Sequence, residues 1–314
     1  MRKTLVTGGC GFIGSHLVDA LITRGERVVI LDNLSTGRKR NLQEHLRSPN
    51  LKVVQGDCKQ PRHLQKAMED VNHVFHLAAN SEIHRSDPTL DFQENILATW
   101  TLLNAIQEKH IERLTFTSTS TVYGEPQILP TPEHYGPLRP ISSYGASKLA
   151  CEALISSHSH LHGIRSTIHR LANIVGSRTT HGVIHDFIKK LRADPHRLEI
   201  LGDGTQTKSY LHVEDCIDGI LQGDQEAREQ VEIYNLGSDD QIPVTEIANI
   251  VTEEMKLRHV TYTYTGGVDG GRGWRGDVKN MLLDTTKLKS TGWKPRHSSR
   301  EAVQLATREL LRGP

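Results

Sequence analysis

The chain has 314 residues, of which 36% are hydrophobic and 24% charged, and its formal net charge is +1. This length and composition suit one large or two modest folded domains. A nearly neutral chain gives no electrostatic case for binding a nucleic acid or a membrane surface, so we expect a small-molecule partner.

The four cysteines, Cys10, Cys58, Cys151 and Cys216, lie far apart. Their spacing indicates neither a metal site nor a disulfide framework. The N-terminal sequence begins directly with a predicted strand and a glycine turn and shows no signal-peptide pattern. No apolar run approaches membrane-spanning length. We therefore expect a cytoplasmic protein.

A dinucleotide-binding turn is predicted at the N-terminus. A short strand over 3–7 is followed by a glycine-rich turn over 8–14 and by apolar residues at helical spacing over 15–23. In that context glycines let the backbone turn tightly and approach a pyrophosphate, which lies against the free amides of the helix. The glycines in question are Gly8, Gly11 and Gly14.

The next predicted strand, over 28–32, ends in Asp32. A carboxylate about 20 residues after the glycine turn is placed to bind a ribose 2′-hydroxyl and would repel a 2′-phosphate, which favours NAD over NADP. The basic run 38–40 follows, and we interpret it as a solvated helix face rather than a phosphate clamp.

Strand patterns recur at 52–54, 73–77 and 113–117, and helical stretches such as 95–107 separate them. This alternation predicts the α/β class, as a Rossmann-type, doubly wound parallel sheet with helices on both faces. Ligands of such sheets bind at the carboxyl ends of the strands. Asp57 could there accept a hydrogen bond from an adenine amino group, and the small Ala78 and Ala79 allow close approach to the cofactor.

After a predicted strand over 165–171 the alternation weakens. We therefore expect an NAD-binding domain over 1–172, to which segments at about 209–240 return. A smaller mixed α/β C-terminal substrate domain is expected from 173–208 and 241–314.

Tyr144 and Lys148 stand four residues apart in Tyr-Gly-Ala-Ser-Lys, so a helix would place them on one face. An unperturbed tyrosine has a pKa of about 10, and a neighbouring cation favours its ionised form. We expect the pKa of Tyr144 to fall toward neutrality, which would make it a general base. The alternative is a helix start with an exposed tyrosine and a solvated lysine, and the accompanying motifs favour the catalytic interpretation.

Four motifs in order resemble the extended short-chain dehydrogenase/reductases, the NAD-dependent epimerase/dehydratase family: Thr-Gly-Gly-Cys-Gly-Phe-Ile-Gly at 7–14, Asp-Asn-Leu-Ser-Thr-Gly at 32–37, Thr-Ser-Thr-Val-Tyr-Gly at 119–124 and Tyr-Gly-Ala-Ser-Lys at 144–148. The segments 202–207 and 210–215 resemble the nucleotide-sugar branch. Within it the chain is most similar to short, archaeal-type UDP-glucose 4-epimerases.

The resemblance implies that Tyr144 is the base, that Lys148 is its electrostatic partner and donates to the nicotinamide ribose, and that Thr119 replaces the usual serine. Threonine keeps the hydroxyl but has restricted rotamers. The positions matching those around NAD are Gly8, Gly11, Phe12, Ile13, Gly14, Asp32, Asn33, Ser35, Thr36, Gly37, Asp57, Cys58, Leu77, Ala78, Ala79, Asn95, Thr117, Tyr144 and Lys148. Those matching substrate contacts are Thr119, Tyr144, Asn173, Lys208, Asn235, Arg272 and Met281.

The implied reaction interconverts UDP-galactose and UDP-glucose by transient oxidation at the sugar C4 and return of the hydride to the other face. UDP-N-acetylglucosamine and UDP-glucuronate stay open as substrates, because Met281, at the family's gatekeeper position, is flexible. Many relatives carry arginine where this chain has Lys208, which can neutralise a phosphate without bidentate geometry.

Rival functions are disfavoured by particular residues. Related dehydratases and decarboxylases typically carry acidic residues at the positions of Ser120 and Thr121, and neither is acidic here. A non-catalytic NAD-binding protein would be expected to lose Tyr144 or Lys148, and both remain. The alternating histidines at 158, 160 and 162 lack an evident third ligand, so we expect no metal. The resemblance also suggests a homodimer formed through two helices per subunit.

Overall fold

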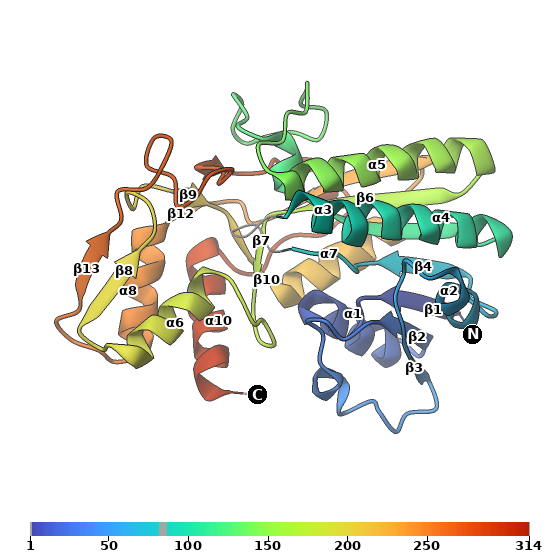
Figure 1. Cartoon of the computed structure of the whole chain (residues 1–314), viewed down its shortest axis with the longest axis horizontal. Coiled ribbons are helices and arrows are strands. Elements are labelled where there is room, and N and C mark those ends of the chain that lie inside the picture. The colour runs from blue at the N-terminus through green and yellow to red at the C-terminus, as the bar shows by residue number, and fades with distance from the viewer. Residues whose placement is uncertain (1, 82–86, 314) are drawn as a thin grey trace. The chain divides into compact units, whose positions relative to one another are not determined.

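The computed structural model describes residues 2–81 and 87–313 (Figure 1). The chain forms two compact units, the first from Met1–Val122, Ser143–Arg170 and Ile220–Tyr234, and the second from Tyr123–Ser142, Leu171–Gly219 and Asn235–Pro314. These bounds differ from those of the expected domains. Compactness does not show what a unit binds, so the division into an NAD-binding and a substrate domain stays a prediction.

A seven-stranded sheet confirms the predicted fold class. Its strand order is β11-β6-β5-β4-β1-β2-β3, and the pairs β1·β2, β2·β3, β1·β4 and β4·β5 are parallel. The strand order reverses between β1 and β4, which is where ligands of doubly wound sheets bind. The strands are β1 (Lys3–Thr7), β2 (Arg27–Asp32), β3 (Leu51–Gln55), β4 (His73–His76), β5 (Arg113–Thr119), β6 (Arg165–Leu171) and β11 (Val231–Leu236).

Helices cover both faces of this sheet: Figure 1 shows α4 and α5 on one side and α1 on the other. The central strands are buried on both faces and therefore read as apolar runs, as in β2, where 28–31 are all buried. The helices before the second unit are α1 (Phe12–Thr23), η1 (Lys39–Leu42), α2 (Pro61–Ala67), α3 (Pro88–Asp91), η2 (Phe92–Leu97), α4 (Ala98–Glu108), η3 (Ser120–Tyr123) and α5 (Ser143–His162).

The helix predicted over 95–107 has an unexpected start. The segment η2 is a π-helix that joins α3 directly to α4. A π-turn forms i→i+5 hydrogen bonds and so holds an extra residue, a feature found frequently at functional sites. Apolar periodicity is dominated by the regular α-helical turns, so it could not reveal this segment.

The second unit has its own apolar core, in which α6, α8 and α10 pack together. Its short strands form small separate sheets. Across the described residues, 2–81 and 87–313, no helix is long and apolar enough to cross a bilayer. The remaining elements are β7 (Asn173–Val175), α6 (Val183–Ala193), β8 (Arg197–Ile200), β9 (Thr207–Lys208), β10 (Tyr210–His212), α7 (Val213–Glu226), β12 (Ile242–Pro243), α8 (Val244–Glu254), β13 (Thr261–Tyr264), β14 (Asn280–Met281), α9 (Thr286–Lys289) and α10 (Ser299–Arg312).

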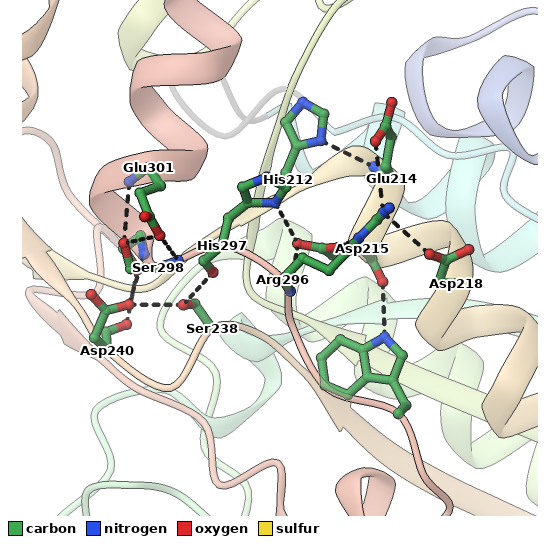
Figure 2. Close-up of polar contacts among 12 residues, drawn as sticks. His212, Glu214, Asp215, Asp218, Ser238, Asp240, Arg296, His297, Ser298 and Glu301 are labelled. Carbon is green, nitrogen blue, oxygen red and sulfur yellow. Dashed lines mark hydrogen bonds and ion pairs between the residues drawn. The ribbon is translucent and has the colours of Figure 1, made fainter.

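A buried carboxylate joins the start of α7 to the segment before α10 (Figure 2). Asp215 is 1% exposed, and its oxygens accept from the Arg296 backbone N–H at 3.1 Å, from Arg296 Nε at 2.5 Å and from His297 Nδ1 at 3.0 Å. The Trp293 indole donates to the backbone oxygen of Asp215 at 3.1 Å. The motif 210–215, which suggested the nucleotide-sugar branch, thus includes a structural anchor of the second unit.

Asp215→Asn should lower the free energy of unfolding by about 3 kcal/mol near neutral pH, because it leaves buried donors without a charged acceptor. Burial opposes ionisation, but the hydrogen bonds and charges of Arg296 and His297 hold the pKa of Asp215 below its ordinary value. A depressed carboxyl pKa stabilises the protein above the unfolded-state pKa of about 4, and this stabilisation is lost as the pH falls through the folded pKa.

Urea denaturation as a function of pH tests this prediction. The difference between wild type and Asp215→Asn should be full near pH 7 and shrink below about pH 4. Asp186→Asn, which removes an exposed ion pair with Lys190, is the matched control and should cost less than about 1 kcal/mol. An equal cost for both variants would contradict the structural role of Asp215.

Candidate active site

The turn between β1 and α1 has no space for side chains at its glycines. Gly8 has φ +72°, and its N–H donates to the Leu31 carbonyl at 2.9 Å. The Gly11 N–H donates to the Gly8 carbonyl at 3.0 Å. A Cβ on Gly14 would lie 2.2 Å from the Gly8 oxygen, so only glycine fits there.

The first turn of α1 is suited to an anion. Its N-cap is Gly11, and in the described part of the chain no side chain caps it and no acidic residue lies in the first turn. Asp32, at the end of β2, accepts from the Cys10 and Leu34 N–H groups, both at 2.8 Å. These bonds orient the carboxylate and leave further lone pairs for a ribose hydroxyl. The glycine turn over 8–14, which we call the cradle, fits a dinucleotide together with the uncapped start of α1 and the oriented Asp32 carboxylate.

Other predicted cofactor positions lie along the same edge of the sheet. A Cβ on Gly37 would lie 2.9 Å from Asp32 Oδ2, and one on Gly8 would lie 2.8 Å from the Ala78 nitrogen. Asp57 has a partner already, the Lys59 ammonium at 3.2 Å. The remaining positions occupy the first turn of α1, the segments after β2, β3 and β4, η2 or β5, namely Phe12, Ile13, Asn33, Ser35, Thr36, Cys58, Leu77, Ala79, Asn95 and Thr117. Their contacts with NAD stay proposals.

The three predicted catalytic residues come together within the first unit. The helix α5 begins one residue before Tyr144 and places Lys148 one turn further along the same face. Thr119 ends β5, and its hydroxyl lies near enough to the Tyr144 phenol to lower the pKa of that phenol. The same hydroxyl lies 3.2 Å from the Thr121 hydroxyl and accepts from the Thr121 N–H, also at 3.2 Å.

Lys148 is almost completely buried, with 2% of its surface exposed. Its ammonium lies 4.0 Å from the centre of the Phe116 ring, and we find no ion pair for it in the described chain. Burial lowers the pKa of Lys148 to about 8, although the neighbouring Cys151 and Glu152 side chains raise it. At neutral pH the side chain is therefore still mainly a cation, held in a largely apolar environment.

The expected fall in the pKa of Tyr144 is wrong for the protein alone. Burial raises this pKa to about 12, a hydrogen bond with Thr119 lowers it, and Asp91 and Cys151 raise it further. The free-energy cost of removing the phenolate from water exceeds the stabilisation that the neighbouring groups give to it. The i,i+4 spacing correctly placed Lys148 one turn after Tyr144 on α5, but sequence spacing contains no measure of burial.

Two cationic side chains that are predicted to bind the substrate lie in the second unit, and each is paired with a carboxylate. Lys208 Nζ lies 2.5 Å from Asp277 Oδ1. One terminal nitrogen of Arg272 lies 2.8 Å from Glu125 Oε1, and its Nε donates to the Asp277 carbonyl at 3.0 Å. A diphosphate would have to share or replace these partners.

Three other residues that are predicted to contact the substrate differ in their exposure and in their hydrogen bonds within the protein. Asn235 has no exposed surface, and its amide accepts from Tyr123 at 2.7 Å and donates to the carbonyls of Thr131 and Asp284 at 2.8 and 3.1 Å. We therefore propose a structural role for Asn235. Asn173 is partly exposed and donates to the Ser209 carbonyl at 3.1 Å, and Met281 is 5% exposed in β14.

Sequence reasoning missed a buried ion pair beside the catalytic residues. Glu152 lies one turn after Lys148 and pairs with Arg170 at 2.7 Å, and it accepts from the Ser118 hydroxyl at 2.5 Å. Glu152 and Arg170 are at most 5% exposed. The i,i+4 continuation from Lys148 was an available signal, because three polar residues on one helical stripe cannot all face solvent in a helix that covers a sheet.

The fold, the glycine cradle and the paired tyrosine and lysine define a dinucleotide-binding enzyme of the doubly wound α/β class. Comparison with known proteins narrows this class. Residues 4–237 match the NAD dependent epimerase/dehydratase family.

Three similar proteins illustrate the range of this family. A Methanocaldococcus jannaschii protein, provisionally named a UDP-glucose 4-epimerase, is 34% identical over 96% of this chain and 95% of its own. UDP-glucuronic acid decarboxylase 2 of Arabidopsis thaliana is 31% identical over 98% of this chain and 68% of its own. A crystal structure of a UDP-galactose 4-epimerase is 39% identical, with a TM-score of 0.88 over 99% of both chains.

The chain belongs to the NAD-dependent epimerase/dehydratase family, and it is an enzyme whose cofactor is NAD. When bound, NAD supplies the acceptor and donor of a hydride. The residues that would hold it are the cradle glycines and Asp32, whose geometry fits it as described above.

Gly14→Ala should abolish NAD retention, because the added methyl group would collide with the Gly8 carbonyl and force the cradle open. The measurement is the NAD released from purified, heat-denatured protein per mole of chain. Gly136→Ala is the control, because a Cβ there meets nothing within 4 Å. Full NAD content in Gly14→Ala would contradict the assignment of the cradle.

Lys148→Met should raise the free energy of unfolding at pH 7 by roughly 3 kcal/mol, because it removes the cost of burying a cation. The folded pKa lies below the unfolded value of 10.5, so the folded state binds the proton more weakly. The advantage of methionine should be complete below about pH 8 and should disappear as the pH rises to about 10.5.

Urea denaturation between about pH 7 and about pH 10 measures this difference. Lys66→Met, at an exposed position of α2, is the control and should change stability by less than about 0.5 kcal/mol. A destabilised Lys148→Met at pH 7 would show that the lysine is not a net cost to the fold.

Proposed function

We propose that the protein is an NAD-dependent UDP-glucose 4-epimerase, which interconverts UDP-galactose and UDP-glucose. The observation that supports this most is that Thr119, at the end of β5 beside Tyr144, and the two residues after it carry hydroxyl groups and no carboxylate. Thr119 and Thr121 lie 3.2 Å apart through their hydroxyls, and Ser120 stands between them. Epimerisation needs proton removal and return at one sugar hydroxyl, whereas loss of water or of a carboxyl group needs additional acid/base groups.

Each catalytic side chain has a separate role in this proposal. The Tyr144 phenol takes the proton of the sugar 4-hydroxyl and later returns it. The Thr119 hydroxyl, which lies beside that phenol, bridges phenol and sugar oxygen. The Lys148 cation favours the phenolate once the cofactor and the substrate are bound. Because the pKa of Tyr144 starts high, at about 12, the protein must provide positive charge before this base can act near neutral pH.

The nucleotide diphosphate is proposed to bind residues of the second unit. Lys208 and Arg272 are cations whose present partners, Asp277 and Glu125, are carboxylates. A diphosphate carries negative charge like these carboxylates and is recognised by the same donors. Met281 is proposed to contact the sugar, where its flexibility leaves UDP-N-acetylglucosamine and UDP-glucuronate as alternative substrates.

The homodimer expected from the sequence stays a proposal. It is supported by large apolar side chains exposed near the start of α4 and on α5, among them Phe92 at 55%, Trp100 at 47% and Leu161 at 74%. Such side chains are typical of surfaces that a partner covers.

Purified protein should convert UDP-galactose into UDP-glucose without added cofactor, because NAD is regenerated within each turnover and need not leave. Tyr144→Phe should lower the rate by about 10²–10⁴-fold, since it removes the only proposed base while keeping the ring. Proton NMR of the sugar products measures both rates.

Tyr264→Phe is the matched control, because Tyr264 is 45% exposed in the second unit, and it should retain the wild-type rate. If wild type leaves UDP-galactose unchanged even with NAD supplied, the hexose assignment is wrong. The same assay then tests UDP-N-acetylglucosamine and UDP-glucuronate, and release of carbon dioxide or water would identify a decarboxylase or dehydratase.

A further inference from the structure

A row of small polar residues runs along α5 beside the catalytic row. Tyr144 and Lys148 form one row at i and i+4, and Ser143 and Ser147 form the neighbouring row at the same spacing. Each residue of the second row therefore precedes a catalytic residue by one position. Anything that fixes the second row also fixes the rotation and the axial position of the catalytic row.

Asp91 fixes the first residue of that row. The Ser143 hydroxyl donates to Asp91 Oδ2 at 2.6 Å, and the Asn80 side-chain amide donates to Asp91 Oδ1 at 2.9 Å. Asp91 itself is 1% exposed, and both contacts are partly buried. One carboxylate thus connects the segment after β4, the end of α3 and the first turn of α5.

Asn95, one turn further along in η2, makes parallel contacts. Its Nδ2 donates to the Ser147 hydroxyl at 2.8 Å, and its Oδ1 accepts from the Asn80 N–H at 2.7 Å. Its backbone oxygen accepts from the Cys151 thiol at 3.4 Å. The two side chains, Asp91 and Asn95, together hold Asn80 and the first two turns of α5 in one register.

We propose that Asp91 is a positioning residue for the Tyr144 base, an inference that rests on the proposed epimerase function. An ionised carboxylate accepts on both oxygens, so it satisfies the Ser143 and Asn80 donors at once. These bonds are charge-assisted and partly buried, which makes them short and strong. Loss of the carboxylate would free the start of α5 and displace the phenol from its place beside the Thr119 hydroxyl.

Asp91 also acts on the base through its charge. Among the titratable groups around Tyr144, Asp91 at the end of α3 and Cys151 on α5 raise its pKa, Lys148 stands one turn further along α5, and β5 contributes the neutral Thr119 hydroxyl. A carboxylate near a phenol disfavours the phenolate. A variant that keeps the shape of Asp91 but not its charge should therefore ionise Tyr144 at lower pH.

Three variants separate position from charge. Asp91→Ala removes both and should lower kcat by about 10–100-fold with KM changed less than about threefold. Ser143→Ala should act in the same direction more weakly, and the double variant should be no worse than Asp91→Ala, because the two residues act through one bond. Asp91→Asn keeps one acceptor and should retain kcat within about threefold while the pH dependence of kcat moves to lower pH.

A second readout does not depend on activity. The ultraviolet absorbance of tyrosinate, taken as the difference from Tyr144→Phe, gives the titration of Tyr144 in wild type and in Asp91→Asn. A lower pKa in Asp91→Asn supports the proposal even if wild type converts none of the tested sugars, which would overturn only the epimerase assignment.

Asp87→Asn is the matched control. Asp87 lies one turn before Asp91 and caps α3 through the Thr89 N–H at 2.9 Å. It should leave kcat and the Tyr144 titration unchanged. If Asp91→Ala does not fold, Ser143→Ala carries the kinetic test. Wild-type kcat and an unshifted Tyr144 titration in folded Asp91 variants would overturn the proposal.

Discussion

The first unit is organised around Lys148, a buried lysine to which no carboxylate of the described residues is bonded. Within the described residues the Lys148 ammonium lies against the Phe116 ring and makes no ion pair. Burial lowers its pKa to about 8 and raises that of Tyr144 to about 12, so each group resists its charged form. A fold optimised only for stability would place neither side chain there. The rest of the unit supplies the packing and hydrogen bonds that hold them.

Those contacts come from three directions. From β5, the Thr119 hydroxyl lies beside the phenol. From the side of α3 and η2, Asp91 and Asn95 hold the neighbouring row of α5. Further along the helix, Glu152 is held by Arg170 at 2.7 Å. A helix held at several points along its length fixes the positions of Tyr144 and Lys148, which is the preorganisation that the proposed catalysis requires.

Much of this could be predicted from the sequence, because the features concerned are local. The glycine turn before an amphipathic helix, Asp32 at a strand end and the i,i+4 spacing of Tyr144 and Lys148 all depend on residues near one another in the chain. Parallel strands appear as apolar runs, so the sheet was predicted correctly, and even the bounds of β6 at 165–171 agree.

What could not be predicted depends on burial and on long-range contacts. The sign of the pKa shift of Tyr144 follows from desolvation, which spacing does not contain. The contact of Asp91 with Ser143 joins residues 52 positions apart, and the π-helix between α3 and α4 has no apolar signature. Asn235 matched a family position, yet the structure shows its amide bonded within the second unit.

The central claim is that the hydride removed from the sugar returns to the same carbon after the proton has passed through Tyr144. The most direct test uses UDP-galactose that carries deuterium at C4 and follows the product by NMR. The account predicts UDP-glucose that retains the deuterium at C4, with an intact carbon chain. Deuterium lost to solvent, or a product that has lost water or carbon dioxide, would contradict it.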